Sequence, residues 1–263
     1  MTSSRSPTPP RSENGSSPAV SSRIDCPSCP EKVVSKKSFE RLTAASEAIY
    51  YAKNVFSYGA GNQEEALESS DFNSYFRMKV ARDNKAFSIP SRVTELAKKN
   101  PIAFKAAKAE LSKGGNCGEH AYVVYDYLRR KFPNEHIQIA QKEGFDHAFV
   151  LIGDPSKEKG GEVVVADAWP TDPTPVLWED HFAFSSDRKK IINHGSSKGD
   201  ARNYKQEMLD AGLSLNSRGN MMIDKSYGSV KTKQEIENGS GWVWNHRATH
   251  AGTQFNYTTD SGS

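Results

Sequence analysis

The chain has 263 residues, a net charge of +3 at neutral pH and a hydrophobic fraction of 36%, which is low for a protein folded along its whole length. Its basic residues form only short, scattered clusters, so we expect no nucleic-acid partner. No run approaches the roughly 18 apolar residues that a membrane-spanning helix needs, so we expect no membrane partner either.

The first 37 residues form a leader that is rich in Ser and Pro and lacks aromatic side chains. Such a segment buries too little apolar area to offset the entropy lost on ordering, so we predict that residues 1–37 are disordered. The leader also lacks the apolar segment of a Sec-type signal peptide. It contains Cys26 and Cys29 as CPSC, which fits half a zinc site or a redox pair. Because no second pair accompanies them, we predict two free thiols.

Residues 38–113 show the apolar spacing of helices. The first predicted helix starts at Ser38, which can act as its N-cap, and continues through SFERLTAASEAIYYAKNVFSY. The last is predicted to end at Gly114 and Gly115, because glycine commonly terminates helices. The other predicted helices cover about 63–82, 89–99 and 101–113.

Beyond the segment around residue 117, the apolar period shifts from that of helices towards that of strands. A helix around 200–212 follows, and GWVWNH near the C-terminus could form one more strand. A helical first half followed by strands predicts an α+β fold, in which the helix that starts at Cys117 packs on an antiparallel sheet. The predicted strands are 136–141, 146–153, 162–169 and 175–184.

The segment GGNCGEHA places Cys117 after two glycines and Asn116, at a predicted helix start. Unpaired backbone N–H groups and the helix dipole favour a thiolate at such a position. Gly114, Gly115 and Gly118 have no side chains, so we expect a substrate backbone to approach closely. The alternative is a buried cysteine that serves as a small apolar residue. A neighbouring base would favour the interpretation of Cys117 as a nucleophile over that of a buried apolar residue.

His147 is the best candidate for that base, because it opens the apolar strand HAFVLIG. Asp167 ends the run VVVAD twenty residues later. If the two strands pair through the loop 154–161, with its tip near residues 157 and 158, His147 and Asp167 come opposite each other. The carboxylate could then hold the imidazole tautomer and stabilise its cation. The alternative is that Asp167 only caps a turn.

Three other residues compete for these roles. His120 follows Cys117 by three positions, a spacing that rarely brings a helical side chain in line with the thiol. Asp146 and Asp172 are competing acids. His246 and His250 have the HxxxH spacing but no helical pattern and no glutamate of a zinc protease, so we expect no metal site. The histidines given no role are His136, His181, His194, His246 and His250.

The segments GGNCGEHA, DHAFVLIG and VVVADAWP resemble the Cys-His-Asp core of the papain-like and transglutaminase-like superfamily. The resemblance covers roughly residues 110–172. The close spacing of histidine and aspartate, and an aspartate where papain has asparagine, are more similar to the transglutaminase-like branch. Similar cores occur in bacterial toxins and type III secreted effectors, which include proteases, glutamine deamidases and transglutaminases. The Ser/Pro-rich leader resembles the export segments of such effectors.

The resemblance implies a nucleophile at Cys117, a base at His147 and an orienting acid at Asp167, with no cofactor. The Cys117 N–H and Asn116 are expected to form the oxyanion site. Gly115 and Trp169 are expected beside the substrate. The upstream glutamine or tryptophan that often completes the oxyanion hole of papain-type enzymes is not identifiable.

The implied activity is acyl transfer on carboxamide or peptide bonds of a protein, which includes proteolysis, deamidation and cross-linking. The expected location is a host cell cytoplasm reached by a non-Sec route, or the cytoplasm of the producing cell. The alternative function is a catalytically inactive papain-like module that docks a partner. The expected domain has a helical part (38–113), a Cys-His-Asp core (114–184) and an extension (185–250), followed by a flexible tail (251–263).

Overall fold

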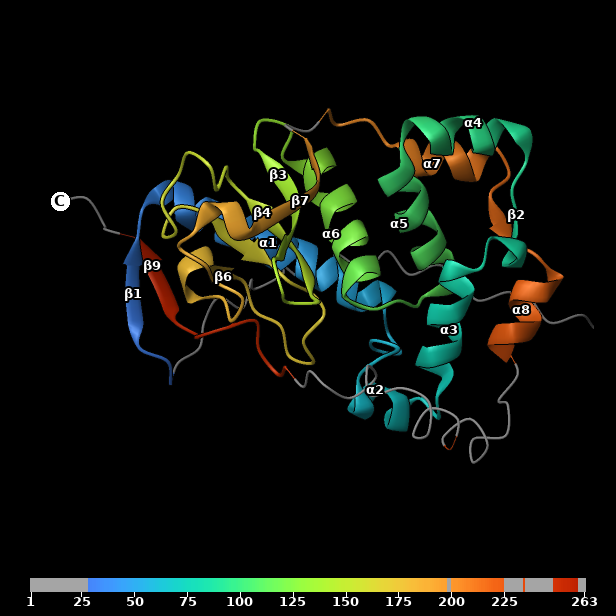
Figure 1. Ribbon diagram of the computed structural model, residues 1–263, viewed down its shortest axis with the longest axis horizontal. Coiled ribbons are helices and arrows are strands. Elements are labelled where there is room, and N and C mark those ends of the chain that lie inside the picture. The colour runs from blue at the N-terminus through green and yellow to red at the C-terminus, as the bar shows by residue number, and fades with distance from the viewer. Residues whose placement is uncertain (1–27, 198–199, 225–233, 235–247, 260–263) are drawn as a thin grey trace, which may run out of the picture.

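The computed structural model describes residues 28–197, 200–224, 234 and 248–259. Figure 1 shows an antiparallel sheet with the helices that cover it in one part of the molecule and a cluster of shorter helices beside it. The predicted α+β class with an antiparallel sheet is therefore confirmed. Among the described helices, none has both the length and the apolar character needed to cross a membrane.

The central sheet has five strands in the order β6-β5-β4-β3-β7, and all neighbouring strands are antiparallel. Alternate residues of these strands enter two apolar clusters, one on each face of the sheet, which explains why nearly continuous β-branched runs form them. The predicted strand 136–141 is present with the same length, shifted by one residue, and the other three predicted strands are present but shorter. Strand β7 was not predicted. The strands are β3 (Ile137–Lys142), β4 (Ala148–Ile152), β5 (Val164–Ala166), β6 (Val176–Leu177) and β7 (Ile191–Ser197).

Two long helices cover one face of the sheet: α1 (Lys36–Val55) packs on β5 and β6, and α6 (Cys117–Lys131) packs on β3 and β4. The N-cap of α1 is Ser35, whose hydroxyl accepts a hydrogen bond from the Ser38 N–H, so the prediction of Ser38 as N-cap is wrong by three residues. The 3₁₀ segment η2 (Trp178–Asp180) follows β6.

Most of the remaining helices form a third apolar cluster, away from the sheet. The predicted helix over 63–82 is two helices, because Asp71 and Phe72 both have positive φ and turn the chain between them. The elements of this cluster are α3 (Asn73–Arg82), η1 (Asn84–Ala86), β2 (Phe87–Ser88), α4 (Ser91–Lys99), α5 (Pro101–Ser112), α7 (Tyr204–Asp210), β8 (Ser214–Leu215) and α8 (Ser217–Asp224). Helix α2 (Glu64–Ser69) belongs to a smaller apolar cluster, and η3 (Arg188–Lys190) directly precedes β7.

The two ends of the described chain pair with each other. Residues 31–34 form β1 (Glu31–Val34), which runs parallel to β9 (Asn256–Thr259) at one edge of the molecule (Figure 1). The predictions of disorder through residue 37 and of a flexible tail from residue 251 are therefore wrong for these strands. Their composition is polar, but the partner strand supplies backbone hydrogen bonds that composition does not reveal. The predicted strand GWVWNH lies outside the described residues.

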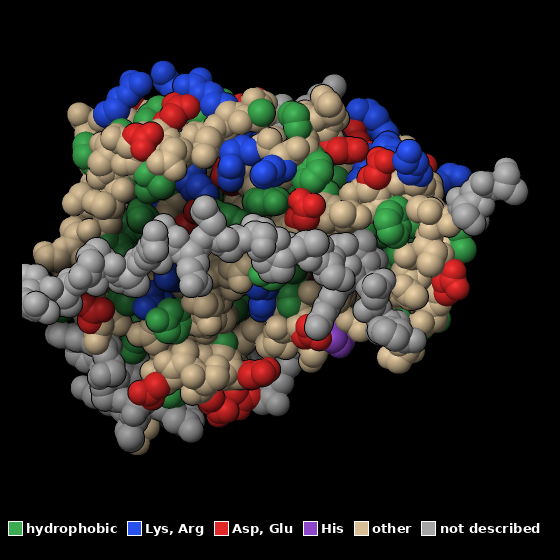
Figure 2. Space-filling view, turned by 180° about the vertical axis from the view of Figure 1, so that it is seen from behind, with side chains coloured by type: hydrophobic (Ala, Val, Ile, Leu, Met, Phe, Trp, Pro, Cys, Tyr) green, Lys and Arg blue, Asp and Glu red, His purple; other side chains and the backbone are tan. Residues whose placement is uncertain are grey.

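The CPSC pair also differs from the prediction. Cys29 is disulfide-bonded, so a free thiol at this position is wrong. Cys117 is the free cysteine of the described residues. On the face shown in Figure 2, Lys and Arg side chains are interspersed with Asp and Glu side chains.

Candidate active site

Cys117 is the first residue of α6, as predicted. Asn116 precedes it in extended conformation, and its backbone N–H donates to the Glu119 carboxylate at 2.8 Å. The thiol is partly exposed at the end of the helix where backbone N–H groups lack helical partners. Because the Asn116 backbone N–H is already used, only the Asn116 side-chain amide remains as the predicted second oxyanion donor.

The glycines before Cys117 serve packing, which corrects their predicted roles. A Cβ on Gly114 would lie 2.3 Å from the Arg77 Cβ, and a Cβ on Gly115 would lie 2.1 Å from the Glu119 Cβ. The carbonyl of Gly115 also accepts a hydrogen bond from the Gly61 N–H at 3.0 Å. These two glycines therefore face protein. The left-handed residue that ends α5 is Lys113, with φ of 53°.

Gly118 behaves differently from the two glycines before it. A Cβ built there would meet one atom within 4 Å, on the ring of Tyr122. The space beside the thiol that was predicted for all three glycines is therefore present at Gly118.

His147 lies one residue before β4 and is 3% exposed. Its Nε2 is 2.6 Å from Asp167 Oδ2, and its ring also hydrogen-bonds the Cys117 side chain, which leaves Nδ1 for the sulfur. Burial lowers the pKa of His147, but the Asp167 charge and the hydrogen bonds to Asp167 and Cys117 outweigh burial and raise it to about 10. The imidazole is thus held as a cation between a thiol and a carboxylate.

Asp167 lies one residue after β5 and is 1% exposed. Oδ1 accepts a hydrogen bond from the Trp169 N–H at 3.1 Å, so this carboxylate does bridge a turn, as the alternative prediction had it. Burial opposes its ionisation, yet the charge and hydrogen bond of His147 and the hydrogen bond of His181 hold its pKa well below the usual range.

The register of β4 and β5 differs from the predicted one. Val150 pairs with Ala166, so Asp167 reaches the level of Phe149 and lies diagonally from His147 instead of directly opposite. The difference is two residues, which leaves each side chain on the predicted face, since strand side chains alternate with period two. The two side chains still meet because diagonal neighbours on one face lie within reach.

Trp169 covers the histidine and leaves little surface for a substrate. Its ring centroid lies 4.9 Å from that of His147, and Trp169 is 3% exposed. Its indole N–H donates to Asn62 Oδ1, and its carbonyl accepts from Gln63 Nε2 at 2.9 Å. The predicted role as a direct substrate contact is therefore not supported. Trp169 instead shields the hydrogen bond between His147 and Asp167 from water.

The competing residues face elsewhere. Asp146 and Asp172 are exposed, and neither is hydrogen-bonded to His147. His120 is 1% exposed, donates from Nδ1 to the carbonyl of Asn116 at 2.8 Å and stacks on Phe56 with ring centroids 3.9 Å apart. His120 therefore stabilises the start of α6 by its contacts with Asn116 and Phe56.

His120 predicts a stability change in acid. Burial, then the charge of Lys53, lowers the pKa of His120 to about 4. Unfolding lets the ring take up a proton below about pH 6.5, so this contribution to stability is complete above that pH and is lost as pH falls towards 4. We expect wild type to lose about 2–3 kcal/mol more than His120→Phe between pH 6.5 and 4.5.

Urea unfolding at the two pH values measures this difference. The exposed His194 provides the control, since His194→Phe should retain the wild-type loss. Equal losses in wild type and His120→Phe would contradict the assignment of a neutral, buried His120.

His181 was given no role from the sequence, but it lies in the site. Its Nε2 is 3.3 Å from Asp167 Oδ2, and its side chain has no exposed surface. It stood inside the predicted strand 175–184, and no sequence pattern there distinguishes it from a strand residue. Of the other histidines without a predicted role, His246 lies outside the described residues.

His147, Asp167 and His181 could geometrically surround a metal ion, since one donor atom from each lies within 4.8 Å of the others. The hydrogen bonds argue against that use. Both imidazoles place Nε2 against the Asp167 carboxylate, and a carboxylate only accepts hydrogen bonds. The two nitrogens are therefore donors here, whereas a metal ligand needs the lone pair.

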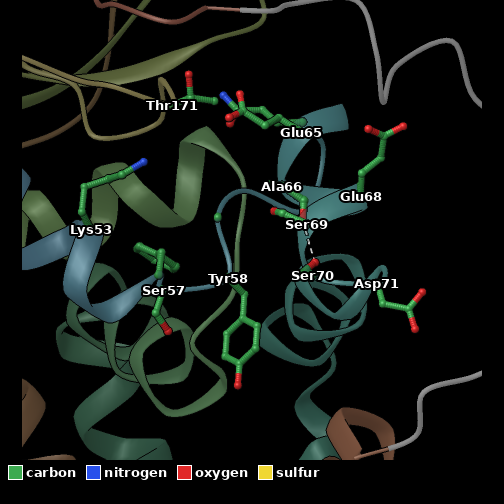
Figure 3. A pocket seen from close by; sticks show the side chains of 13 residues that line it. Lys53, Ser57, Tyr58, Glu65, Ala66, Glu68, Ser69, Ser70, Asp71 and Thr171 are labelled. Carbon is green, nitrogen blue, oxygen red and sulfur yellow. Dashed lines mark hydrogen bonds between the residues drawn. The ribbon is translucent and has the colours of Figure 1, made fainter.

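A cavity of about 750 Å³ adjoins the segment that follows Asp167. Lys53, Gln63 and Thr171 line it near this segment, and Glu65 points towards Thr171 (Figure 3). Lys53 donates to the carbonyl of Pro170 at 3.0 Å. Polar and apolar surface contribute about equally to the cavity wall, which includes three carboxylates, those of Glu65, Glu68 and Asp71.

No protein-family model matches the sequence, and neither the curated proteins nor the solved structures include a significant match.

Proposed function

We propose that the chain is a cysteine-dependent acyl-transfer enzyme with a papain-like or transglutaminase-like core, acting on carboxamide or peptide bonds of a protein. One observation carries the proposal: the buried imidazole of His147 contacts the Cys117 thiol and lies 2.6 Å from the Asp167 carboxylate. A nucleophile, a base and a group that orients the base are the parts that such chemistry needs.

The acylation step follows from these contacts. The Cys117 sulfur, as a thiolate, attacks the carbonyl carbon, and the oxygen charge that develops is stabilised by N–H donors at the start of α6. His147 gives its proton to the departing amine as the carbon–nitrogen bond breaks. The product is a thioester on Cys117.

The deacylation step reverses the proton transfer. Water or a second amine attacks the thioester and gives a proton to His147, and the carbon–sulfur bond breaks to restore the thiolate. When the acyl group comes from a glutamine side chain, attack by water gives deamidation and attack by an amine gives cross-linking. When the acyl group comes from the peptide backbone, attack by water gives proteolysis. Asp167 keeps the imidazole oriented in both steps.

The same resemblance leads us to propose a bacterial effector that meets its protein substrate in a host cell. The support is the order of the three segments in the sequence and the Ser/Pro-rich leader.

The test is a proteome-wide mass-spectrometric comparison of cells that produce wild type or Cys117→Ala. New peptide termini in wild type alone indicate proteolysis, conversion of glutamine to glutamate indicates deamidation, and isopeptide links indicate cross-linking. His194→Ala is the matched control and should give the wild-type pattern. Identical proteomes for wild type and Cys117→Ala would favour a binding module instead.

A further inference from the structure

His181 is a buried polar side chain to which the proposed reaction assigns no task. It follows η2 and is packed between aromatic rings, with centroids 4.3 Å from Phe182, 4.5 Å from Phe149 and 5.8 Å from Trp178. An imidazole sealed in this way must satisfy both nitrogens within the protein. Each has one partner.

The two partners determine which nitrogen carries the proton. The backbone N–H of Ala183 donates to His181 Nδ1 at 3.2 Å, so Nδ1 must present a lone pair. The proton of the neutral ring is therefore on Nε2, and Nε2 faces Asp167 Oδ2. A second proton on Nδ1 would oppose the Ala183 N–H. Accordingly burial, which outweighs the Asp167 charge, lowers the pKa of His181.

We infer that His181 is a positioning residue for the Cys117–His147 pair: as a neutral, fixed-tautomer donor, it holds the Asp167 carboxylate with Oδ2 towards His147. The inference rests on the proposed function. Asp167 then receives three donors, the Trp169 N–H on Oδ1 and the two imidazoles on Oδ2. Three donors on one buried carboxylate favour its ionised form, and together they fix the orientation of the carboxylate plane.

The chain's C-terminal segment holds His181 in place. His181 and Gly252 pair as an isolated antiparallel β-bridge. Its hydrogen bonds run from the Phe182 N–H to the Ala251 carbonyl and from the Thr253 N–H to the Asp180 carbonyl. A Cβ on Gly252 would lie 2.1 Å from the Asp180 oxygen, so this approach requires glycine. A segment about 85 residues beyond Asp167 thus supports the orientation of its carboxylate.

Two other titratable groups lie near His181. The His147 ring centroid is 6.4 Å away, and its positive charge opposes protonation of His181. The Asp180 carboxylate is engaged by Lys32 at 2.8 Å and by the Tyr257 hydroxyl at 3.3 Å. Asp167 is therefore the carboxylate on which His181 acts.

The experiment combines histidine NMR with thiol labelling in a protein that carries Cys26→Ser and Cys29→Ser, so that Cys117 is its single cysteine. When this single-cysteine protein carries no further change, its ¹⁵N spectrum should show His181 unprotonated at Nδ1 and protonated at Nε2. His181→Phe keeps a ring but removes the donor. It should lower the pH at which His147 titrates by about one unit and slow iodoacetamide labelling of Cys117 about tenfold at neutral pH.

His181→Gln is the conservative variant, since its side-chain amide can reach Asp167 as a donor. It should restore labelling to within about threefold of wild type. A protonated Nδ1 in wild type, or an unchanged His147 titration in a folded His181→Phe, would overturn the inference. Slow labelling of Cys117 already in wild type would instead count against the proposed function, and the His147 titration would still decide the role of His181.

Discussion

Asp167→Asn should reduce turnover of the protein substrate by about 10²–10⁴-fold. Three N–H donors surround the carboxylate, from His147, His181 and Trp169. An amide has one oxygen, so its NH₂ group must face a donor whichever way the side chain is turned. Either His147 changes tautomer and no longer presents the correct nitrogen to Cys117, or the hydrogen bond to Trp169 is lost.

The measurement is the rate of product formation on the peptide identified by the proteome comparison, for wild type and for Asp167→Asn. Asp172→Asn makes the same chemical change at an exposed position five residues further on and should leave the rate within about twofold of wild type. An Asp167→Asn protein that is folded and as active as wild type would contradict the orienting role.

Asp167 also predicts a pH effect on stability. Its pKa in the folded protein is depressed, so its contribution is present above the ordinary aspartate range, about pH 4, and is lost as pH falls through the folded value. Asp167→Asn should therefore unfold with a weaker dependence on pH on the acid side than wild type.

The second large effect is expected at His147. In the single-cysteine protein, His147→Ala should slow iodoacetamide labelling of Cys117 by about 10²-fold at pH 7, because the thiolate loses its neighbouring cation. Mass spectrometry of the intact protein over time gives both rates.

In the labelling experiment, His194→Ala, which removes an exposed histidine, should label at the wild-type rate. Equal labelling of wild type and His147→Ala would show that the imidazole does not activate the thiol.

The stability arising from His147 has the opposite pH dependence to that from Asp167. Its raised folded pKa makes this contribution complete below about pH 6.5, and it is lost as pH rises towards about 10.

Local features of the sequence were sufficient to predict several parts of the site. Cys117 follows an extended residue and opens a helix, and the start of a helix depends mainly on neighbouring residues. The alternation in HAFVLIG and VVVAD predicted which side chains share a face, and that prediction survives a register shift of two residues because the alternation has period two.

Tertiary packing decided the rest, because the groups involved are far apart in the chain. His181 lies in an ordinary strand-like run, and only the fold directs its Nε2 at Asp167. Gly114 and Gly115 read as a helix stop, yet their small size is required by Arg77 and Glu119. Residues 31–34 and 256–259 form strands because β1 and β9 supply each other's backbone partners across more than 200 residues, a contact that no local pattern records.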